Sequence, residues 1–255
     1  NPESSILPDR YSYVDKQKNT VVRKQGNLGT CWATAALTAL QTSLMPEENY
    51  YFSADHMSLN NSFNLEQYEG GSSTMSTAYL LAWQGPVLEA DDPYGDGETN
   101  PDLQAVKHVQ EIQMLESKDL QKIKEMVYKY GGVQTSLYTI MQNTFDYSRY
   151  YNEKTNSYCY VGTEKPNHDV VIIGWDDNYP KENFRADIES DGAFICQNSW
   201  GYTNATSMPR SDQEAIEYFI KYAGTDENGE QVGPMKGGIV IFAAGNEERD
   251  YMSYP

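Results

Sequence analysis

The segment from Gln25 to Leu44 constrains the fold of this chain more than any other. A glycine-containing turn at 25–30 is followed by a mostly apolar run that stops just before Pro46. The run predicts a helix over 30–44, and its apolar residues fall on nearly every side of that helix. Such a helix has to be buried, and proline ends it because proline cannot continue a helix. We therefore expect the rest of the chain to pack around one central helix.

Length and charge limit the classes of function that fit. A chain of 255 residues is long enough for one large domain or two lobes with a core. The net charge of −18 excludes electrostatic binding to nucleic acid as the main activity, leaving a solvated acidic surface or a preference for basic substrates. No apolar run approaches the roughly 18 residues of a membrane span, so we expect no membrane insertion. No signal-peptide pattern is seen and the sequence starts at Asn1 without Met, from which we expect a processed form.

Cys31 stands where the predicted central helix begins. The free N–H groups and the positive dipole end of a helix start favour thiolate over thiol. Gln25 lies across the turn, where its side-chain amide could point back at the sulfur. The alternative is a buried cysteine that only packs. The position indicates a reactive thiol.

A histidine and an asparagine follow far downstream in strand-like contexts. His168 precedes the apolar run 170–175, and Asn198 ends the run 192–198. Of the three histidines, His168 is the best candidate for a base, because His108 lies in a charged context without an orienting partner. His56 has no second metal ligand at a helical spacing, so we interpret it as a surface or capping histidine.

Four motifs in this order resemble the papain-like cysteine peptidases, in particular bacterial secreted or cell-surface members. They are Gln25, Cys31-Trp32-Ala33, Asn167-His168 and Asn198-Ser199-Trp200-Gly201, and the resemblance covers about residues 6–202. His168 and Asn198 follow Cys31 by 137 and 167 residues, near or somewhat beyond the roughly 130–150 that is typical of the family.

The resemblance implies an α+β, papain-like two-lobe fold in a single domain, 1–255. A helical lobe at about 25–110 and a β-rich, barrel-like lobe from 111 would enclose the active-site cleft between them. Cys31 would be the nucleophile, His168 its base and Asn198 the residue that orients the imidazole. Gln25 would form the oxyanion hole with the Cys31 N–H.

Substrate binding is implied for three further residues. Gly70 and Gly71 would line the cleft, although the pair could be only a turn. Trp200 would cover the hydrogen bond between Asn198 and His168, and a core aromatic is the alternative role.

The function that these residues imply is a cysteine endopeptidase acting on peptides or proteins, as a monomer without cofactor or metal, secreted or at the bacterial cell surface. Two alternatives stay open: a catalytically inactive peptidase-like binding module, and a thiol-dependent acyl-transferase.

The remaining cysteines and acidic residues suggest weaker possibilities. Cys159 and Cys196 could form a disulfide that leaves Cys31 free, or each could be buried alone. An acidic cluster at 91–98 lacks the spacing of a calcium loop, so we expect no metal there.

The sequence departs from the family pattern at several points. Leu28 replaces a disulfide cysteine of many relatives. Asp169 replaces a small residue, and we expect it to favour the His168 imidazolium only modestly, because on a strand it points to the opposite face.

The tail 203–255 is atypical. Its Ser211-Asp212-Gln213-Glu214 capping box predicts a helix over 215–222. Residues 237–247 resemble a subtilisin-type segment, but the chain lacks the His-Gly-Thr and Gly-Thr-Ser motifs of a serine triad. Elsewhere we expect helices at 53–59, 76–83 and 117–130 and strands at 133–138, 170–175 and 192–198.

Overall fold

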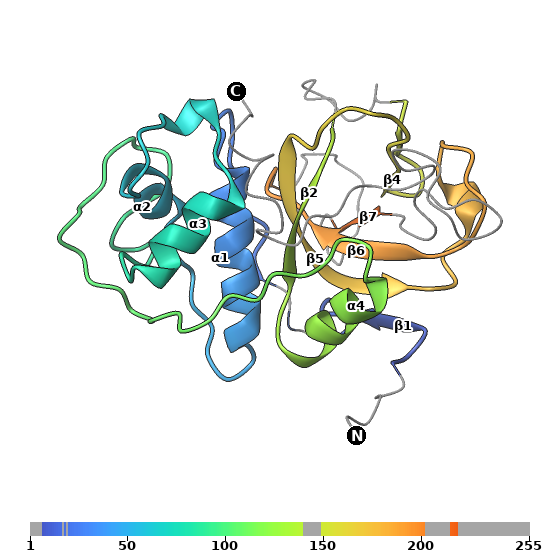
Figure 1. Ribbon diagram of the computed structural model, residues 1–255, viewed down its shortest axis with the longest axis horizontal. Helices are drawn as coiled ribbons and strands as arrows, with labels where there is room; N and C mark the ends of the chain where they lie inside the picture. The colour runs from blue at the N-terminus through green and yellow to red at the C-terminus, as the bar shows by residue number, and fades with distance from the viewer. Residues whose placement is uncertain (1–6, 17, 19, 140–148, 202–214, 219–255) are drawn as a thin grey trace.

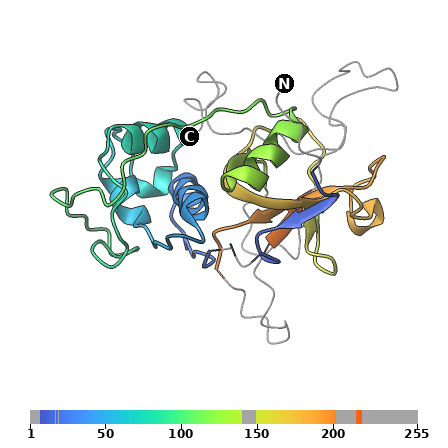
Figure 2. The same cartoon turned by 90° about the horizontal axis from the view of Figure 1, so that it is seen from below.

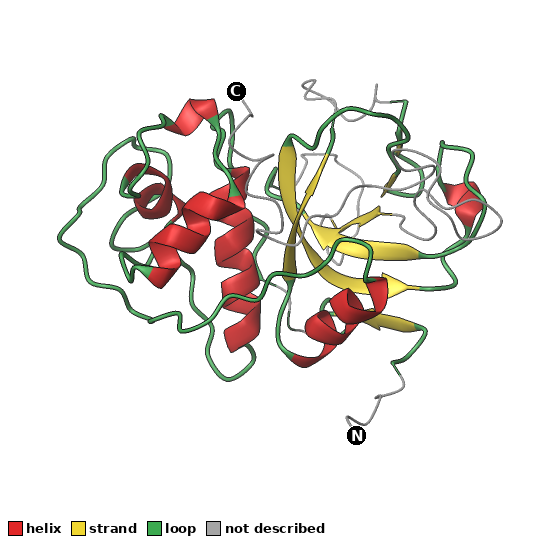
Figure 3. Ribbon diagram, in the orientation of Figure 1, coloured by secondary structure: helices red, strands yellow, loops and turns green. Residues whose placement is uncertain are grey.

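The computed structural model describes residues 7–16, 18, 20–139, 149–201 and 215–218. One side of the molecule is helical, and the other holds the sheet with the helix at 120–129 packed beside it (Figures 1 and 3). The helices are α1 (Cys31–Leu44), α2 (Ala54–Leu59), α3 (Ser73–Leu81) and α4 (Leu120–Lys129), with short 3-10 turns at Gln67–Glu69 and Lys181–Asn183. The strands are β1 (Arg10–Ser12), β2 (Val133–Leu137), β3 (Tyr151–Asn152), β4 (Ser157–Tyr158), β5 (His168–Asp176), β6 (Ala193–Gln197) and β7 (Ala215–Tyr218).

Helix α1 lies between the two sides, as both views show (Figures 1 and 2). It contacts α2 and α3 on one side and β2 and β5 on the other. Its residues from Trp32 to Thr38 are buried, which confirms the prediction of a central buried helix. None of the described helices has the length and apolar character needed to cross a bilayer.

The sheet is built around β5. Antiparallel β1 and β2 pair with the two ends of β5, and β6 pairs along it on the other edge. Beyond β6 the order continues with β7, β4 and β3. Every residue of β5 from His168 to Trp175 is buried. The continuous apolar run at 170–175 is therefore part of a central strand.

Two main hydrophobic cores flank α1. One surrounds Phe52, Met57 and Leu37 on the helical side, and the other surrounds Ile172 and the buried face of α4 on the sheet side. The segment 109–115 passes from one to the other: Val109 packs on the helical core and Leu115 on the sheet core. The predicted α+β class is confirmed.

Some expectations fail in detail. Residues 215–218 form strand β7 and not the predicted helix, because their backbone pairs antiparallel with β6 and parallel with β4. Tertiary pairing overrides a local capping signal here. The rest of that predicted helix and the subtilisin-like segment 237–247 lie outside the described residues.

Two side-chain predictions are settled inside the cores. Cys159 and Cys196 are both free and buried, so the possible disulfide is absent and the alternative is confirmed. His56 is fully buried and bonds Tyr79 through Nδ1 at 2.6 Å, so the surface assignment is wrong. Ser53 caps α2 by accepting a hydrogen bond from the His56 N–H.

Candidate active site

Cys31 is the first residue of α1 and carries a free, half-buried thiol. The N-cap residue Thr30 makes no side-chain cap, because its hydroxyl bonds the Tyr94 hydroxyl at 2.5 Å. The first-turn N–H groups therefore remain available. Backbone N–H groups of Asp169, Trp32 and Cys31 itself hydrogen-bond the sulfur. The sulfur thus lies against the residue that follows His168 on β5.

His168 opens β5, and Asn198 follows the last residue of β6. The His168 Nε2 and the Asn198 Oδ1 are 2.7 Å apart, a short hydrogen bond that fixes the imidazole. The other ring nitrogen, Nδ1, is buried without a hydrogen-bond partner among the described residues. An imidazole held at Nε2 in this way carries its proton there and leaves Nδ1 as the basic nitrogen.

Trp200 stacks on the His168 ring, with centroids 4.7 Å apart and planes 26° from parallel. His168 is only 2% exposed as a result of this cover and the sheet around it. The indole lies where the sequence predicted a cover for the histidine–asparagine pair.

Burial opposes charge on both Cys31 and His168. Burial is the main cause that raises the pKa of the Cys31 thiol to about 12, with the nearby Asp169 carboxylate adding to it and the three N–H bonds opposing it. Burial also lowers the pKa of His168 to about 4, against the bond to Asn198, which raises it. The helix start therefore does not by itself produce a thiolate, contrary to the expectation from sequence. Burial therefore favours the neutral thiol and the neutral imidazole.

Gln25 is held firmly beside the helix start. Its Nε2 donates to the Leu28 carbonyl at 2.8 Å, and its Oε1 accepts from the Ser199 hydroxyl at 2.5 Å. Its backbone N–H donates to the Ser199 carbonyl at 2.7 Å, which joins the turn to the end of β6. One Nε2 hydrogen stays free of these bonds, and an amide N–H of this kind is a suitable oxyanion donor.

The Gly70-Gly71 pair lies against the same turn. Gly70 has φ of +93°, which favours glycine, and a side chain on Gly29 would meet the Gly70 nitrogen at 2.6 Å. A side chain on Gly71 would meet the Trp32 indole nitrogen at 2.2 Å. Only glycine fits at these contacts. Gly71 therefore packs directly against Trp32, the residue that follows Cys31.

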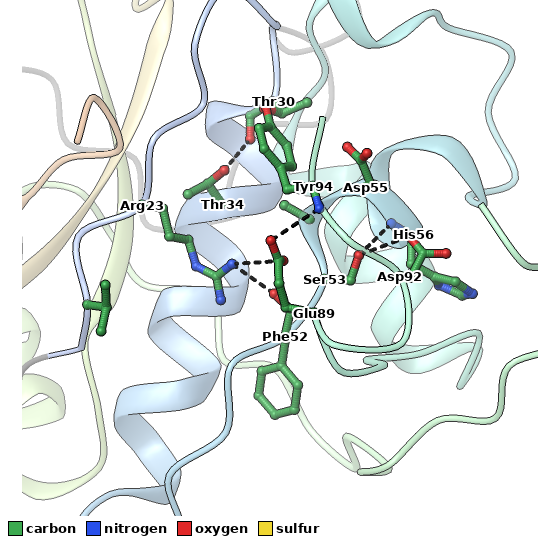
Figure 4. Close-up of polar contacts among 12 residues, drawn as sticks. Arg23, Thr30, Thr34, Phe52, Ser53, Asp55, His56, Glu89, Asp92 and Tyr94 are labelled. Carbon is green, nitrogen blue, oxygen red and sulfur yellow. Dashed lines mark hydrogen bonds and ion pairs between the residues drawn. The ribbon is translucent and has the colours of Figure 1, made fainter. Parts of the chain in front are cut away.

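A buried polar network behind the turn escaped the sequence reasoning (Figure 4). Arg23 is 5% exposed, donates to the Phe52 carbonyl at 2.8 Å and faces Glu89 at 3.8 Å. Glu89 accepts from the Tyr94 N–H at 3.2 Å. The Tyr94 hydroxyl in turn donates to the Gln25 carbonyl at 2.8 Å. The loop 89–94 thereby supports both ends of the turn that precedes Cys31.

In the acidic cluster at 91–98, Asp92 makes hydrogen bonds that hold the loop in place. Asp92 accepts hydrogen bonds from Ser53, Thr99 and the Asn100 N–H. The described residues contain no group of three or more acidic, histidine or cysteine side chains that could hold a metal ion.

Asp169 acts on a different group from the one expected. Its carboxylate raises the pKa of Cys31 and is not among the causes of the His168 shift. Alternation along β5 directs the His168 and Asp169 side chains to opposite faces of the strand.

Comparison with known proteins places these features in a family. The profile described as papain family cysteine protease matches residues 7–207. The chain is 27% identical over 201 residues to a viral cathepsin of Heliothis zea nuclear polyhedrosis virus, which covers 76% of this chain and 49% of that protein. It is 26% identical over 205 residues to cathepsin K of Mus musculus, covering 76% and 56%. The chain thus spans about half the length of these curated relatives.

Solved structures show the same fold. The cysteine protease and lectin-like domains of Cwp84, a surface layer associated protein of Clostridium difficile, align with a TM-score of 0.70 and 26% identity over 93% of this chain and 50% of that one. A structure of clostridial Cwp84 after propeptide cleavage aligns with a TM-score of 0.71, also at 26% identity, over 90% and 57%. The predicted two-lobe papain-like fold is confirmed.

Proposed function

Because this chain belongs to the papain family of cysteine proteases, we propose that it is an endopeptidase that cleaves peptide bonds through a Cys31 thioester. The observation that carries the proposal is the His168 ring. It is fixed at Nε2 by Asn198 at 2.7 Å, covered by Trp200, and unpartnered at Nδ1 among the described residues. A ring held in this way is ready to accept a proton at one defined atom.

The first half of the reaction forms the acyl-enzyme. The Cys31 thiol transfers its proton to His168 Nδ1 as the sulfur attacks the peptide carbonyl carbon. The oxyanion accepts hydrogen bonds from the Cys31 backbone N–H and the free Gln25 amide hydrogen. The tetrahedral intermediate then expels the amine, which takes the proton from His168, and a thioester remains.

The second half releases the acid. Water attacks the thioester carbonyl and gives a proton to His168. The carbon–sulfur bond then breaks, the sulfur recovers the proton, and the carboxylic acid leaves. An amine in place of water would give a new amide, so the acyl-transferase alternative differs only in this step.

Location and partners belong to the same proposal. We place the protein outside the cell or on the surface of a bacterium, by analogy with the surface layer association of Cwp84. Its partner is a peptide or protein substrate, and it acts as a monomer without cofactor or metal.

Replacing the nucleophile tests the proposal. We expect Cys31→Ala to abolish cleavage of a mixed peptide library, with an unchanged circular dichroism spectrum, because no other group can form the thioester. Cys159→Ala removes a fully buried thiol and is the matched control. Cleavage by folded Cys31→Ala refutes the proposal. A wild-type protein that binds peptides but never cleaves them supports the binding-module alternative, and ligation products support the transferase.

A further inference from the structure

Asp169 is a buried carboxylate that, among the described residues, is held by neutral groups. Its Oδ1 accepts from the Ser136 hydroxyl at 2.6 Å and its Oδ2 from the Gln134 amide at 2.8 Å. The residue is 8% exposed. Since an ionised carboxylate offers about four acceptor positions, these two bonds leave acceptor capacity unused.

Within the part of the chain that the structure describes, this carboxylate has no counter-charge. Among the described residues, no ion pair includes Asp169. The neighbouring imidazole of His168 is engaged with Asn198 and Trp200 instead. Burial raises the pKa of Asp169, and the two neutral donors only oppose that effect. Buried carboxylates are normally paired with a cation, so the arrangement lacks one expected partner.

The position of this carboxylate ties it to the reacting sulfur. The backbone N–H of Asp169 bonds the Cys31 sulfur, and its charge acts on the thiol. The Gln134 amide that bonds Asp169 also donates to the Trp32 carbonyl at 3.2 Å, across the junction between α1 and β2. A peptide whose carbonyl lay at the Cys31 sulfur would pass next to the Asp169 backbone, and its neighbouring side chains would come near this carboxylate.

Space for an aliphatic chain lies beside Gln134, one of the two donors to this carboxylate, although Asp169 itself is not among the residues that line it. Gln134 lines a cavity of about 390 Å³ between α1, α3 and β2. Its walls include Ala36, Leu80 and Val133. Lysine and arginine bury an apolar stem while their charged end finds a polar partner, and this combination of walls and carboxylate suits them.

We propose that Asp169 is a specificity-determining residue that selects substrates with a lysine or arginine one or two residues before the scissile bond. The inference rests on the proposed peptidase function. A cationic side chain of the substrate would supply the counter-charge that the Asp169 carboxylate lacks among the described residues. The net charge of −18 also attracts basic substrates at long range.

Matched peptides test the preference. At each of the two positions, kcat/KM is measured with arginine and with citrulline, which has nearly the same shape without the charge. We expect arginine to be preferred at least tenfold at one position in the wild type, because charge-assisted hydrogen bonds are about twice as strong as neutral ones. In Asp169→Asn the ratio should fall to about twofold or less.

The ratio is taken within each protein, so a general loss of activity in the variant cancels. Glu182→Gln removes the same charge from an exposed 3-10 turn and should keep the wild-type ratio. Equal kcat/KM for arginine and citrulline peptides in the wild type overturns the proposal, even if Asp169→Asn does not fold. A preference that persists in folded Asp169→Asn overturns it as well.

A binding measurement separates this inference from the proposed function. The Cys31→Ala protein is titrated calorimetrically with the same arginine and citrulline peptides. If the wild type cleaves nothing but Cys31→Ala binds the arginine peptide at least tenfold more tightly, the peptidase proposal fails and the charge selection stands. Equal binding of the two peptides by Cys31→Ala contradicts the charge selection whether or not the wild type cleaves.

Discussion

Two opposing effects act on the Cys31 sulfur. Hydrogen bonds from three backbone N–H groups favour the thiolate, while burial and the Asp169 carboxylate favour the thiol. Burial wins, and the pKa rises to about 12. The sequence predicts that Cys31 lies at the start of a helix. It does not predict how deeply the sulfur is buried, because that depends on the packing of β5 against α1.

The effect of burial on His168 sets the direction in which activity should depend on pH. In the proposed mechanism His168 has to be neutral to accept the thiol proton, and burial lowers its pKa to about 4. Activity should therefore be present above this pKa and disappear as the pH falls through about 4. An unperturbed histidine would place the loss near pH 6.5 instead.

At the scale of elements, the turn before α1 is held from outside by the loop 89–94. The Tyr94 hydroxyl contacts the Gln25 carbonyl at 2.8 Å and the Thr30 hydroxyl at 2.5 Å. Behind it, Glu89 connects Tyr94 to the buried Arg23 (Figure 4). The loop thus supports the turn that carries Gln25, the proposed oxyanion donor.

Removing the Tyr94 hydroxyl should loosen this support. We expect Tyr94→Phe to lower kcat by about 3- to 10-fold with little change in KM, because a lost hydrogen bond is worth about 1 kcal/mol and the oxyanion forms only after binding. Tyr128→Phe, at an exposed tyrosine of α4, is the control. An unchanged kcat, or an effect confined to KM, would argue against the positioning role.

Sequence patterns predict the helices and strands of this chain better than they predict its side-chain contacts. The predicted helices at 30–44 and 117–130 correspond to α1 and α4, and the run 170–175 lies within β5, because each has a strong local pattern. The polar partners of Asp169 and Tyr94 come from distant segments, so no local signal could reveal them. The sequence marks Asp169 only as a departure from the family pattern, and its effect falls on Cys31 and not on His168, where it is expected.

At the scale of the whole molecule, the sheet extends past the region that matches the family. The match ends at residue 207, whereas β7 covers Ala215–Tyr218 and lies between β6 and β4. Strand β6 delivers Asn198, so a strand outside the family match supports the strand that orients His168.

Truncation tests this role of β7. A chain ending at residue 201 would leave the edge of β6 unpaired, and we expect it to unfold at a lower urea concentration than a chain ending at residue 218. The reason is the loss of the ladder from Phe194–Tyr218 to Gln197–Ala215. Equal urea midpoints for the two chains would show that β7 adds nothing to the stability of the sheet.

The most direct test of the central claim, that His168 takes the proton of Cys31, is the rate of Cys31 alkylation by iodoacetamide against pH. Labelling is mapped by mass spectrometry in the wild type, in His168→Ala and in the exposed control His108→Ala. We expect wild type and His108→Ala to label Cys31 ahead of the buried Cys159 and Cys196, with a rate that rises as the pH passes about 4. In His168→Ala this rise should be absent, and labelling should stay slow until the pH approaches the thiol pKa of about 12. Identical profiles in the wild type and His168→Ala, or equal slow labelling of all three cysteines, would contradict the account.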